Sequence, residues 1–390
     1  MAKWLRFGAG MLSLYYFLFY AFHGSYLPII NLFFEKELYF TGTQIGLLFS
    51  INYVLTTISP PFLGGVSDTL HRPRTVIAAC LLLSSIALVL FARLMIFWQV
   101  VIVMVLFSFF NSPLFPLIDS LALGYAGKTG VGFGRMRAWG SVGFIAAALF
   151  LGVLFAHKPD LTLAFWFAAT ASVLALMLVP LLPEVPVQRM GNVGRRAIAV
   201  FRQPDVLVLT LCAVLGNVAM MAYYTFFSNY LFHMAFYDKW VAPVWAIGAV
   251  AEIPFIFHAD SIIARLGVRT VFAIGLGAVA TRMFLLSLKP PVWLILASQL
   301  LHPFTYAAIA ICGMIYLNTR CPADLRGSAQ SIFGAAFMGA GGIIGSMIGG
   351  WFIDAYDVWQ MMLAHGTIAG IGMILFLLFF RAHENSASAQ

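Results

Sequence analysis

The sequence is poor in charge. Only 9% of its 390 residues are Asp, Glu, Lys or Arg, whereas 62% are hydrophobic. A water-soluble domain has about a quarter charged residues on average. A chain this apolar cannot keep most of its surface in water, so the composition excludes an ordinary soluble domain. It predicts an all-α membrane protein whose main partner is the lipid bilayer.

Cysteine is also scarce, and its spacing excludes the common cysteine sites. The four cysteines, Cys80, Cys212, Cys312 and Cys321, form no CxxC pair and no metal-like pattern, so we interpret them as packing residues. The sequence also lacks HExxH, GxSxG and paired aspartates, which an intramembrane enzyme would need. We therefore predict no metal, no cofactor and no enzymatic activity.

Long apolar runs, in contrast, recur from end to end. A helix needs roughly 20 apolar residues to cross a bilayer, and the sequence contains twelve such runs. The first six are Phe7–Phe34, Thr43–Ser67, Arg74–Arg93, Phe97–Tyr125, Arg137–His157 and Leu161–Leu182. The second six are Asp205–Phe232, Trp240–Ala264, Thr270–Leu288, Val292–Leu317, Gly327–Asp354 and Trp359–Phe380. The first run is too long for the apolar core of a signal peptide, so we interpret it as a retained span.

The longest break between runs is basic and proline-containing. It divides the sequence into a six-helix bundle over 1–183, a cytoplasmic linker over 184–204, and a second six-helix bundle over 205–390. Such a linker between two bundles is expected of a duplicated transporter.

The placement of Lys and Arg predicts the topology. On the side that holds the linker and both termini, they outnumber those on the other side by roughly three to one. We therefore predict a multi-pass protein of the inner (plasma) membrane with cytoplasmic termini. The net charge is +8, but the basic residues form no patch with interleaved aromatics, so we expect no nucleic-acid partner.

Two loops repeat one another in the two halves. Each has an aspartate at a helix end and two arginines a few residues later, and we interpret these six residues as a gate that closes the cytoplasmic side. They are Asp68, Arg72 and Arg74 after the second span, and Asp260, Arg265 and Arg269 after the eighth. The alternative is that they only anchor the topology. Spans five and eleven also begin alike, with Gly134-Arg135 and Arg326-Gly327.

A family resemblance rests on these residues. The pattern Gly-x-x-x-Asp-x-x-x-Arg-x-Arg, at Gly64, Asp68, Arg72 and Arg74, resembles the signature loop of the major facilitator superfamily. The segments at 111–119 (NSPLFPLID) and 137–143 (RAWGSVG) are similar to the phenylpropionate permease branch, a relative of lactose permease and the nucleoside–proton symporters. The resemblance covers essentially the whole chain. It implies the major facilitator fold, with 12 transmembrane helices in two six-helix bundles, and a monomer.

Ionisable side chains inside the spans point to function. Each costs roughly 2.5–3.5 kcal/mol to insert, so it persists where it faces water or a partner. Asp119 in span four and Arg137 at the start of span five can face each other and bind a substrate, and Trp139 follows on the same helix. The alternative is a salt bridge that fixes the helix register.

The second half has its own set of such side chains, Glu252, Arg282 and His302. A carboxylate in a low-dielectric site takes up a proton more readily than one in water, whereas a neighbouring arginine favours its ionised form. Histidine also changes charge near neutral pH. We therefore predict that these residues couple transport to protons. The alternatives are a structural ion pair between Glu252 and Arg282, and a neutral hydrogen-bonded His302.

The resemblance implies the same roles. Lactose permease-like symporters use an acid in span four and an arginine in span five for substrate, and an acid, an arginine and a histidine in spans eight, nine and ten for substrate and proton. This sequence departs from that pattern after His302, where Phe304-Thr305-Tyr306 contains no acid. Glu252 is therefore the first choice for the proton carrier.

Polar residues at helical spacing mark two further candidate cavity walls. Span one has Tyr16, Tyr20 and His23 on one face, and span seven has Asn217 and Tyr224. We interpret Tyr20, His23, Asn217 and Tyr224 as substrate-binding residues. The alternative is a stripe of hydrogen bonds between helices. A run of glycines in span eleven, Gly341, Gly345 and Gly349, favours close helix packing.

The function predicted from the sequence is proton-coupled symport of a small organic solute, such as an aromatic acid, a sugar or a nucleoside. A proton-coupled efflux antiporter for drugs or sugars is the alternative. Span five lacks the proline of the antiporter motif, which weighs against it.

Overall fold

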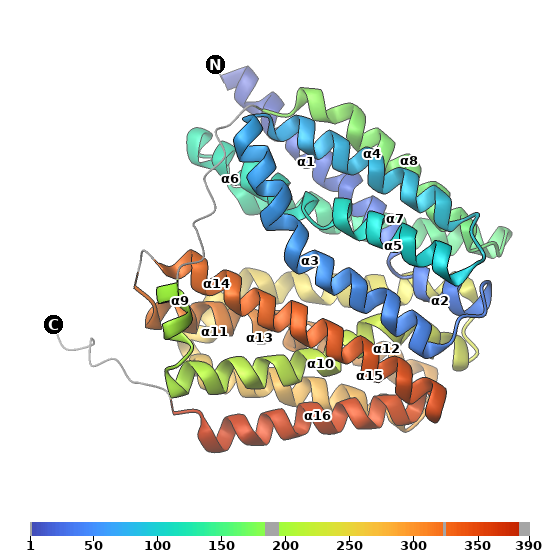
Figure 1. Ribbon diagram of the computed structural model, residues 1–390, viewed down its shortest axis with the longest axis vertical. Helices are drawn as coiled ribbons and strands as arrows, with labels where there is room; N and C mark the ends of the chain where they lie inside the picture. The colour runs from blue at the N-terminus through green and yellow to red at the C-terminus, as the bar shows by residue number, and fades with distance from the viewer. Residues whose placement is uncertain (1, 184–194, 323–324, 382–390) are drawn as a thin grey trace. The chain divides into compact units, whose positions relative to one another are not determined.

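The protein is almost entirely helical in its computed structural model (Figure 1). The structure describes residues 2–183, 195–322 and 325–381, and for residues 2–6, 195, 256–257, 259 and 260 it describes the backbone alone. In the first half the helices are α1 (Ala2–Tyr26), α2 (Ile30–Lys36), α3 (Gly42–Leu70), α4 (Pro73–Phe91), α5 (Phe97–Asn111), α6 (Leu114–Thr129), α7 (Phe133–His157), α8 (Thr162–Leu178) and η1 (Val179–Leu181).

The second half continues in the same way. Its helices are α9 (Arg195–Val200), α10 (Pro204–His233), α11 (Asp238–Ser287), α12 (Val292–Ser298), η2 (Gln299–Leu301), α13 (His302–Arg320), α14 (Arg326–Gly334), the π-helical segment η4 (Ala335–Ala340), α15 (Gly341–Ala355) and α16 (Val358–Phe379). Eleven helical segments of the described chain are long and apolar enough to cross a membrane. They match the predicted spans one to seven and nine to twelve, and the predicted eighth span occupies the first part of α11.

Helix ends follow local sequence signals. The Thr41 side chain accepts a hydrogen bond from the Gln44 N–H, and the Gln44 side-chain oxygen accepts one from the Thr41 N–H, so α3 starts with a capping box. α6 ends at Gly130, which has φ +73° and therefore the left-handed conformation that glycine adopts most readily. Asp357 caps α16 by accepting from the N–H groups of Trp359 and Gln360.

Two predicted spans are less regular than expected. The span Phe97–Tyr125 is divided between α5 and α6 at Ser112–Pro113, because proline has no N–H and crowds the preceding turn. α11 contains a non-helical residue, Gly267, with φ 77° and ψ 153°. Gly267 therefore separates two helices within α11.

Contacts between residues group the chain into two compact units. Unit 1 is Met1–Met190 with Thr225–Val250, and unit 2 is Gly191–Tyr224 with Ala251–Gln390. The division at 183 and 205 expected from the sequence stays a prediction, and residues 184–194 of the linker lie outside the described residues.

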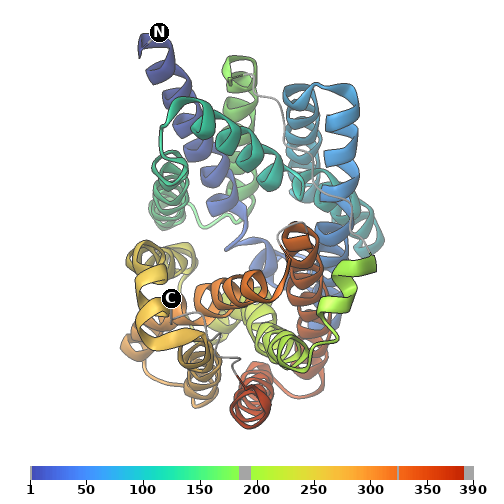
Figure 2. The same cartoon turned by 90° about the vertical axis from the view of Figure 1, so that its left-hand side faces the viewer.

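Close helix packing holds each unit together. In unit 1, α1 packs along α7 and α8, and α4 packs along α5 and α8 (Figure 1). In unit 2, α10 and α16 run alongside each other, with Gly372 of α16 against Leu215 of α10. Figure 2 shows α16 nearly end-on. The two units thus provide two sets of helices, and each set contains part of the predicted site.

Candidate functional site

A polar cluster in unit 1 joins α1, α6 and α7. The Tyr16 hydroxyl on α1 donates a hydrogen bond of 2.6 Å to Asp119 Oδ1 on α6. Arg137 Nη1 on α7 lies 3.7 Å from Asp119 Oδ2, and Arg137 Nη2 donates to the Tyr20 hydroxyl at 3.3 Å. The structure therefore brings together three of the predicted substrate-binding residues, Asp119, Arg137 and Tyr20, and adds Tyr16.

This cluster is partly open. The Asp119 side chain is 24% exposed and the Arg137 side chain 47% exposed. An ion pair that remains partly hydrated can exchange its partner for a polar solute at less cost than a fully buried pair. The cluster thus offers a carboxylate that accepts hydrogen bonds beside a guanidinium that donates them.

Glycines on α7 bring Arg137 to this position. A Cβ on Gly140 would lie 2.8 Å from the Tyr20 ring, and a Cβ on Gly143 would overlap the Phe17 carbonyl. A Cβ on Gly24 of α1 would likewise meet the Phe144 backbone. Only glycine permits this approach, so the small residues of span five place the start of α7 against α1.

His23 is buried and hydrogen-bonded within unit 1. It is 3% exposed, its Nδ1–H donates to the Phe19 carbonyl at 2.9 Å, and its Nε2 lies 3.4 Å from the Asn111 amide. Both ring nitrogens therefore have protein partners. This geometry agrees with the alternative reading of span one, a stripe of interhelical hydrogen bonds.

Trp139 is not part of the Asp119–Arg137 cluster. It lines a cavity of about 990 Å³ together with Gly10, Leu14 and Phe17 of α1 and Arg135 of α7, and the cavity lining does not include Asp119 or Arg137. Trp139 is two residues from Arg137, so on a helix the two side chains point about 200° apart. Trp139 and Arg137 are therefore on the same helix but do not contribute to the same site.

A second polar cluster, in unit 2, surrounds Arg282. This side chain is 1% exposed. Its Nη2 donates to the Tyr223 hydroxyl at 2.5 Å and to Gln299 Oε1 at 2.6 Å, and the guanidinium lies 4.2 Å from the centre of the Tyr223 ring. Hydrogen bonds and a cation–π contact therefore stabilise a buried cation. The sequence reasoning found Arg282 but missed Tyr223 and Gln299.

His302 connects Arg282 with Tyr224. Arg282 Nη1 lies 3.3 Å from His302 Nδ1, and His302 Nε2 lies 3.4 Å from the Tyr224 hydroxyl. If the arginine donates to Nδ1, the proton of a neutral His302 is on Nε2, which then donates to Tyr224. Glu252, half-buried on α11, is near enough to interact electrostatically with Tyr224. The structure thus brings Arg282, His302, Tyr224 and Glu252 into one neighbourhood.

Asn217 takes part in helix packing. It is fully buried, and its amide donates to the Phe337 carbonyl in η4. A π-helical turn leaves carbonyls without their usual helical partner, and Asn217 satisfies one of them. Gly341, immediately after η4, leaves room for the Asn217 side chain, since a Cβ there would lie 2.8 Å from its Nδ2.

Two of the six predicted gate residues donate hydrogen bonds to carbonyls at helix ends. Arg74 donates to the Leu182 carbonyl in unit 1, and Arg269 donates to the Leu377 carbonyl in unit 2 at 3.0 Å. In both cases the arginine precedes its acceptor by 108 residues, so the two halves repeat one contact. Asp68 is half-buried, Arg72 and Arg265 are exposed, and the side chain of Asp260 lies outside the described residues.

Comparison with known proteins decides the family. The chain matches the MFS_1 like family over residues 10–364, which is most of its length. The chain belongs to this family. The expected relation to the major facilitator superfamily is therefore confirmed.

Individual relatives share about a quarter of its residues. The chain is 27% identical to the probable 3-phenylpropionic acid transporter of Escherichia coli (strain K12), over 91% of this chain and 92% of that protein. It is 24% identical to the maltose permease of Geobacillus stearothermophilus, over 97% and 96%. The crystal structure of the nucleoside transporter NupG superposes with a TM-score of 0.86 at 22% identity, covering 96% of this chain and 99% of that one. The expected major facilitator fold is confirmed.

This MFS_1 like protein is an integral, multi-pass membrane protein that transports small solutes. Its family consists of transporters, so the prediction that it is not an enzyme is also confirmed. The described residues contain no group of three or more His, Cys, Asp or Glu that could hold a metal ion.

A third polar cluster of the transporter was not anticipated. In unit 1, Glu35 on α2 accepts hydrogen bonds from Asn229 Nδ2 at 2.5 Å and from His233 Nε2 at 2.7 Å, both on α10. Lys36 pairs with Asp238 at the start of α11 at 2.6 Å. We call these five residues the α2–α10 cluster. The sequence alone could not pair Lys36 with Asp238, because the two residues are 202 positions apart.

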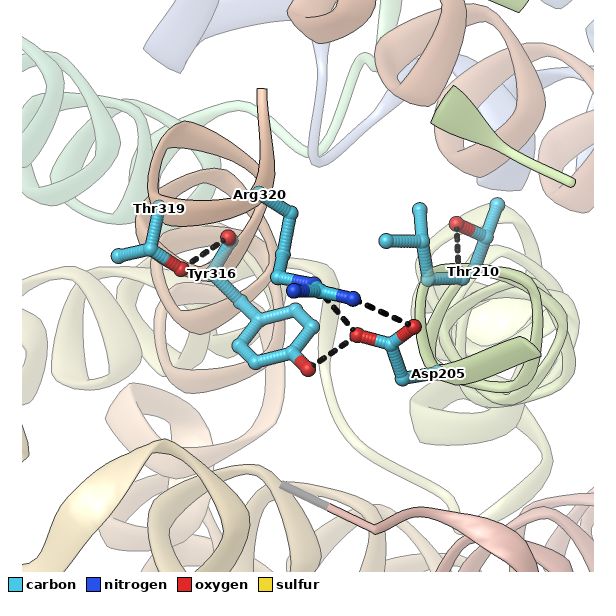
Figure 3. Close-up of polar contacts among 6 residues, drawn as sticks. Asp205, Thr210, Tyr316, Thr319 and Arg320 are labelled. Carbon is cyan, nitrogen blue, oxygen red and sulfur yellow. Dashed lines mark hydrogen bonds and ion pairs between the residues drawn. The ribbon is translucent and has the colours of Figure 1, made fainter. Parts of the chain in front are cut away.

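A fourth contact fastens the start of α10 to the end of α13 (Figure 3). Arg320 Nε lies 2.7 Å from Asp205 Oδ2, its Nη2 lies 3.3 Å from Oδ1, and the Tyr316 hydroxyl donates to Oδ2 at 2.5 Å. Asp205 also lies in the first turn of α10, where the helix dipole favours a negative charge. Thr210 and Thr319, drawn in the same view, donate to carbonyls of their own helices. Arg320 and Tyr316 of α13 thus both bind Asp205 and hold the start of α10 within unit 2.

Proposed function

We propose that this transporter is a proton-coupled symporter of a small organic solute, working by alternating access in the inner (plasma) membrane with both termini in the cytoplasm. The single observation that best supports this proposal is the pair of polar clusters inside the spans. One surrounds Asp119 and Arg137 in unit 1, and the other surrounds Arg282 and His302 in unit 2. Charges kept inside the membrane in both sets of helices suit a solute and ion pathway.

The Asp119–Arg137 cluster has the chemistry to bind the solute. Asp119 accepts hydrogen bonds, Arg137 donates them, and Tyr16 and Tyr20 can do both. Arriving hydroxyl or carboxylate groups would replace the long 3.7 Å contact between the two charges. The cluster therefore suits a solute that carries both hydrogen-bond donors and acceptors.

The Arg282 cluster has the chemistry to couple transport to a proton. Glu252 is the only acid of the proposed set. His302 and Tyr224 form a hydrogen-bonded series that starts at Arg282, and Tyr224 interacts electrostatically with Glu252. A protonated Glu252 would be neutral beside Tyr224, whereas an ionised one would be attracted toward the Arg282 cation. Loading and release of the proton would thereby change the electrostatics around α11 during the transport cycle.

The helix-end contacts and the α2–α10 cluster suit the two gates of such a cycle. Arg74 and Arg269 hold helix ends on the side that we assign to the cytoplasm. On the other side, Glu35 and Lys36 join the end of span one to α10 and α11. Alternating access requires contacts of this kind to form at one end while those at the other end break.

The relatives suggest the solute class. Their names point to a sugar, an aromatic carboxylate and a nucleoside. Asp119 suits the hydroxyls of a sugar or nucleoside, and Arg137 suits a carboxylate. We propose one of these three classes as the substrate.

A thermal-shift screen identifies the class. The purified transporter would be heated with maltose, with a panel of nucleosides or with 3-phenylpropionate, and a binder should raise the melting temperature. The stabilising compound is then added to cells that make the transporter, in weakly buffered medium. Symport predicts that the medium becomes alkaline, because protons enter the cells together with the added solute. An antiporter that takes up the added solute must release protons in exchange, so it predicts that the medium becomes acidic.

A further inference from the structure

The cavity lined by Trp139 is outside the proposed transport site. It lies in unit 1 between residues 9–17 of α1 and the first two turns of α7, and the end of α6 completes it. Its volume of about 990 Å³ is in the upper part of the range of small-molecule pockets. No transport role described above uses it.

The walls of the cavity are mainly apolar. The apolar lining includes Leu14 and Phe17 of α1, Val131 before α7 and Met136 within α7. A Cβ added to Gly10, which also lines the cavity, would meet nothing within 4 Å. The space beside α1 is therefore wide enough for an alkyl chain.

The cavity opens away from the core of the unit. Leu14 is 41% exposed and Trp139 is 51% exposed. Both belong to segments that qualify as membrane spans, Phe7–Lys36 and Phe133–His157. Exposed apolar side chains on a span are more stable against acyl chains than against water, so we assign this face to lipid. The lining begins near the start of both spans, at Ala9 and Arg135, and continues along α1 to Phe17, so the cavity extends from the level of the lipid headgroups toward the acyl chains.

Among the described side chains, Arg135 is the cation that lines the cavity. Arg135 lies in the first turn of α7 and is exposed, and within the described chain its guanidinium makes no hydrogen bond or ion pair. Two residues further, Arg137 is bonded to Tyr20 and paired with Asp119. Trp139, about half exposed, adds an indole, a group that favours the boundary between acyl chains and headgroups. The cavity thus combines an apolar slot with a donor-rich, positively charged edge.

We propose that this cavity is a binding site for an anionic glycerophospholipid, with one acyl chain along Leu14 and Phe17 and the phosphate on Arg135. The anionic class follows from charge complementarity, because Arg135 and Trp139 supply donors at the edge. Basic pockets between membrane helices bind acidic lipid headgroups by the same physics. The site is separate from the solute pathway and does not depend on the proposed symport.

Native mass spectrometry of the delipidated, detergent-purified transporter tests the site, with phosphatidylglycerol and phosphatidylcholine of the same acyl chains as probes. We expect about fivefold greater retention of phosphatidylglycerol, the effect of one basic residue on an acidic lipid. Arg135→Ala should bring the two lipids to equal retention, and Arg135→Lys should keep most of the preference. Arg326→Ala is the matched control, because Arg326 is an exposed arginine at the start of the corresponding span of the second half.

A second variant tests the apolar slot without touching the charge. Gly10→Leu places a side chain in the cavity and should lower retention of both lipids severalfold. Gly370→Leu, at another open helical position, should leave it unchanged. Equal retention of both lipids by the wild type, or unchanged preference in Arg135→Ala, would overturn the proposal. Displacement of phosphatidylglycerol by millimolar inorganic phosphate would indicate a free-anion site instead. Wild-type retention of both lipids by Gly10→Leu would show that no acyl chain occupies the cavity.

Discussion

At the scale of single residues, Arg282 shows how a buried cation is accommodated in this transporter. A charge in a low-dielectric interior is tolerated only when its donors are satisfied. Tyr223, Gln299 and His302 supply acceptors from two other helical segments, and the Tyr223 ring covers one face of the guanidinium. The planar fork of arginine matches this arrangement, which a lysine ammonium does not.

Arg282→Lys should therefore lower the transport rate at least tenfold and lower the melting temperature. A lysine loses the stacking on Tyr223 and cannot reach Gln299 and His302 at the same time, and each hydrogen bond to a charged group contributes about 1.5–3 kcal/mol. Tyr223→Phe, which removes one hydroxyl, should have a smaller effect. Initial uptake rates and thermal unfolding measure both. A lysine variant with wild-type uptake would show that the geometry around Arg282 is not required.

The Asp119 carboxylate and the Tyr16 hydroxyl give a prediction for substrate binding. Asp119→Asn should raise the KM at least tenfold, because it removes the charge but keeps the side-chain volume. Tyr16→Phe should raise it severalfold, because it removes the donor 2.6 Å from Asp119. Tyr39→Phe, at an exposed tyrosine, is the control. If both site variants keep the wild-type KM, the cluster serves only to fix helix register.

The sequence predicted the ionisable residues of the clusters better than the side chains that contact them. It identified Asp119, Arg137, Glu252, Arg282 and His302 from their cost in the membrane alone. It could not assign Tyr223 or Gln299, because polar neutral residues in spans are not unusual. Nor could it predict that Tyr20 contacts Arg137 whereas His23 does not. Helical spacing shows which residues share a face of a helix, but not which residues of other helices that face contacts.

At the scale of helices, small residues set the distance between neighbours. Gly140 and Gly143 bring α7 to α1, and Gly341 and Gly345 bring α15 to Asn217 and Val218 of α10. Spans five and eleven thus pack on spans one and seven in the same way. The glycine run in span eleven predicted such packing, but the helix it contacts was not predictable from the run.

Gly143→Ala should therefore destabilise the transporter, since its Cβ would overlap the Phe17 backbone, which cannot move aside as a side chain can. Overpacking of this kind costs about 1–3 kcal/mol. Gly127→Ala is the matched control, because a Cβ there meets nothing within 4 Å and alanine favours the helix. Thermal unfolding in detergent compares the two. Equal melting temperatures would mean that α1 and α7 are not in close contact.

Helix boundaries were the least predictable feature. The capping residues Thr41 and Asp357 conform to known preferences, whereas the break at Pro113 and the π-helical turn η4 lie within runs that read as continuous. Hydrophobicity reports the length of a run and not the backbone inside it. Asn217 shows the consequence, since its partner is a carbonyl that an unbroken α-helix would have used.

At the scale of the whole molecule, the two halves repeat one contact and differ in their chemistry. Arg74 and Arg269, which lie in the two repeated loops, donate to equivalent helix ends. The ionisable clusters do not repeat, because Asp119 and Arg137 are on spans four and five and Glu252, Arg282 and His302 are on spans eight to ten. A duplicated scaffold has therefore acquired different functional groups in each half.

The α2–α10 cluster gives a prediction about gating. In Glu35→Gln with Asp238→Asn, both ion pairs of the cluster are lost, so the outer side should open more often. Ser228→Cys reports this, because Ser228 is buried and donates to the Pro28 carbonyl. Its reaction with a membrane-impermeant maleimide should be severalfold faster in the double-variant background than alone. The native cysteines are all buried. An unchanged rate would show that the cluster is not a gate.

The central claim is that Glu252 couples the solute to a proton. It is tested most directly by measuring pH and solute together in proteoliposomes, with the compound identified by thermal shift. The account predicts that an imposed proton gradient drives accumulation in the wild type. Glu252→Gln should abolish accumulation but keep exchange of labelled for unlabelled solute, and Glu37→Gln, at an exposed position, should behave as wild type. Uphill accumulation by Glu252→Gln would contradict the account.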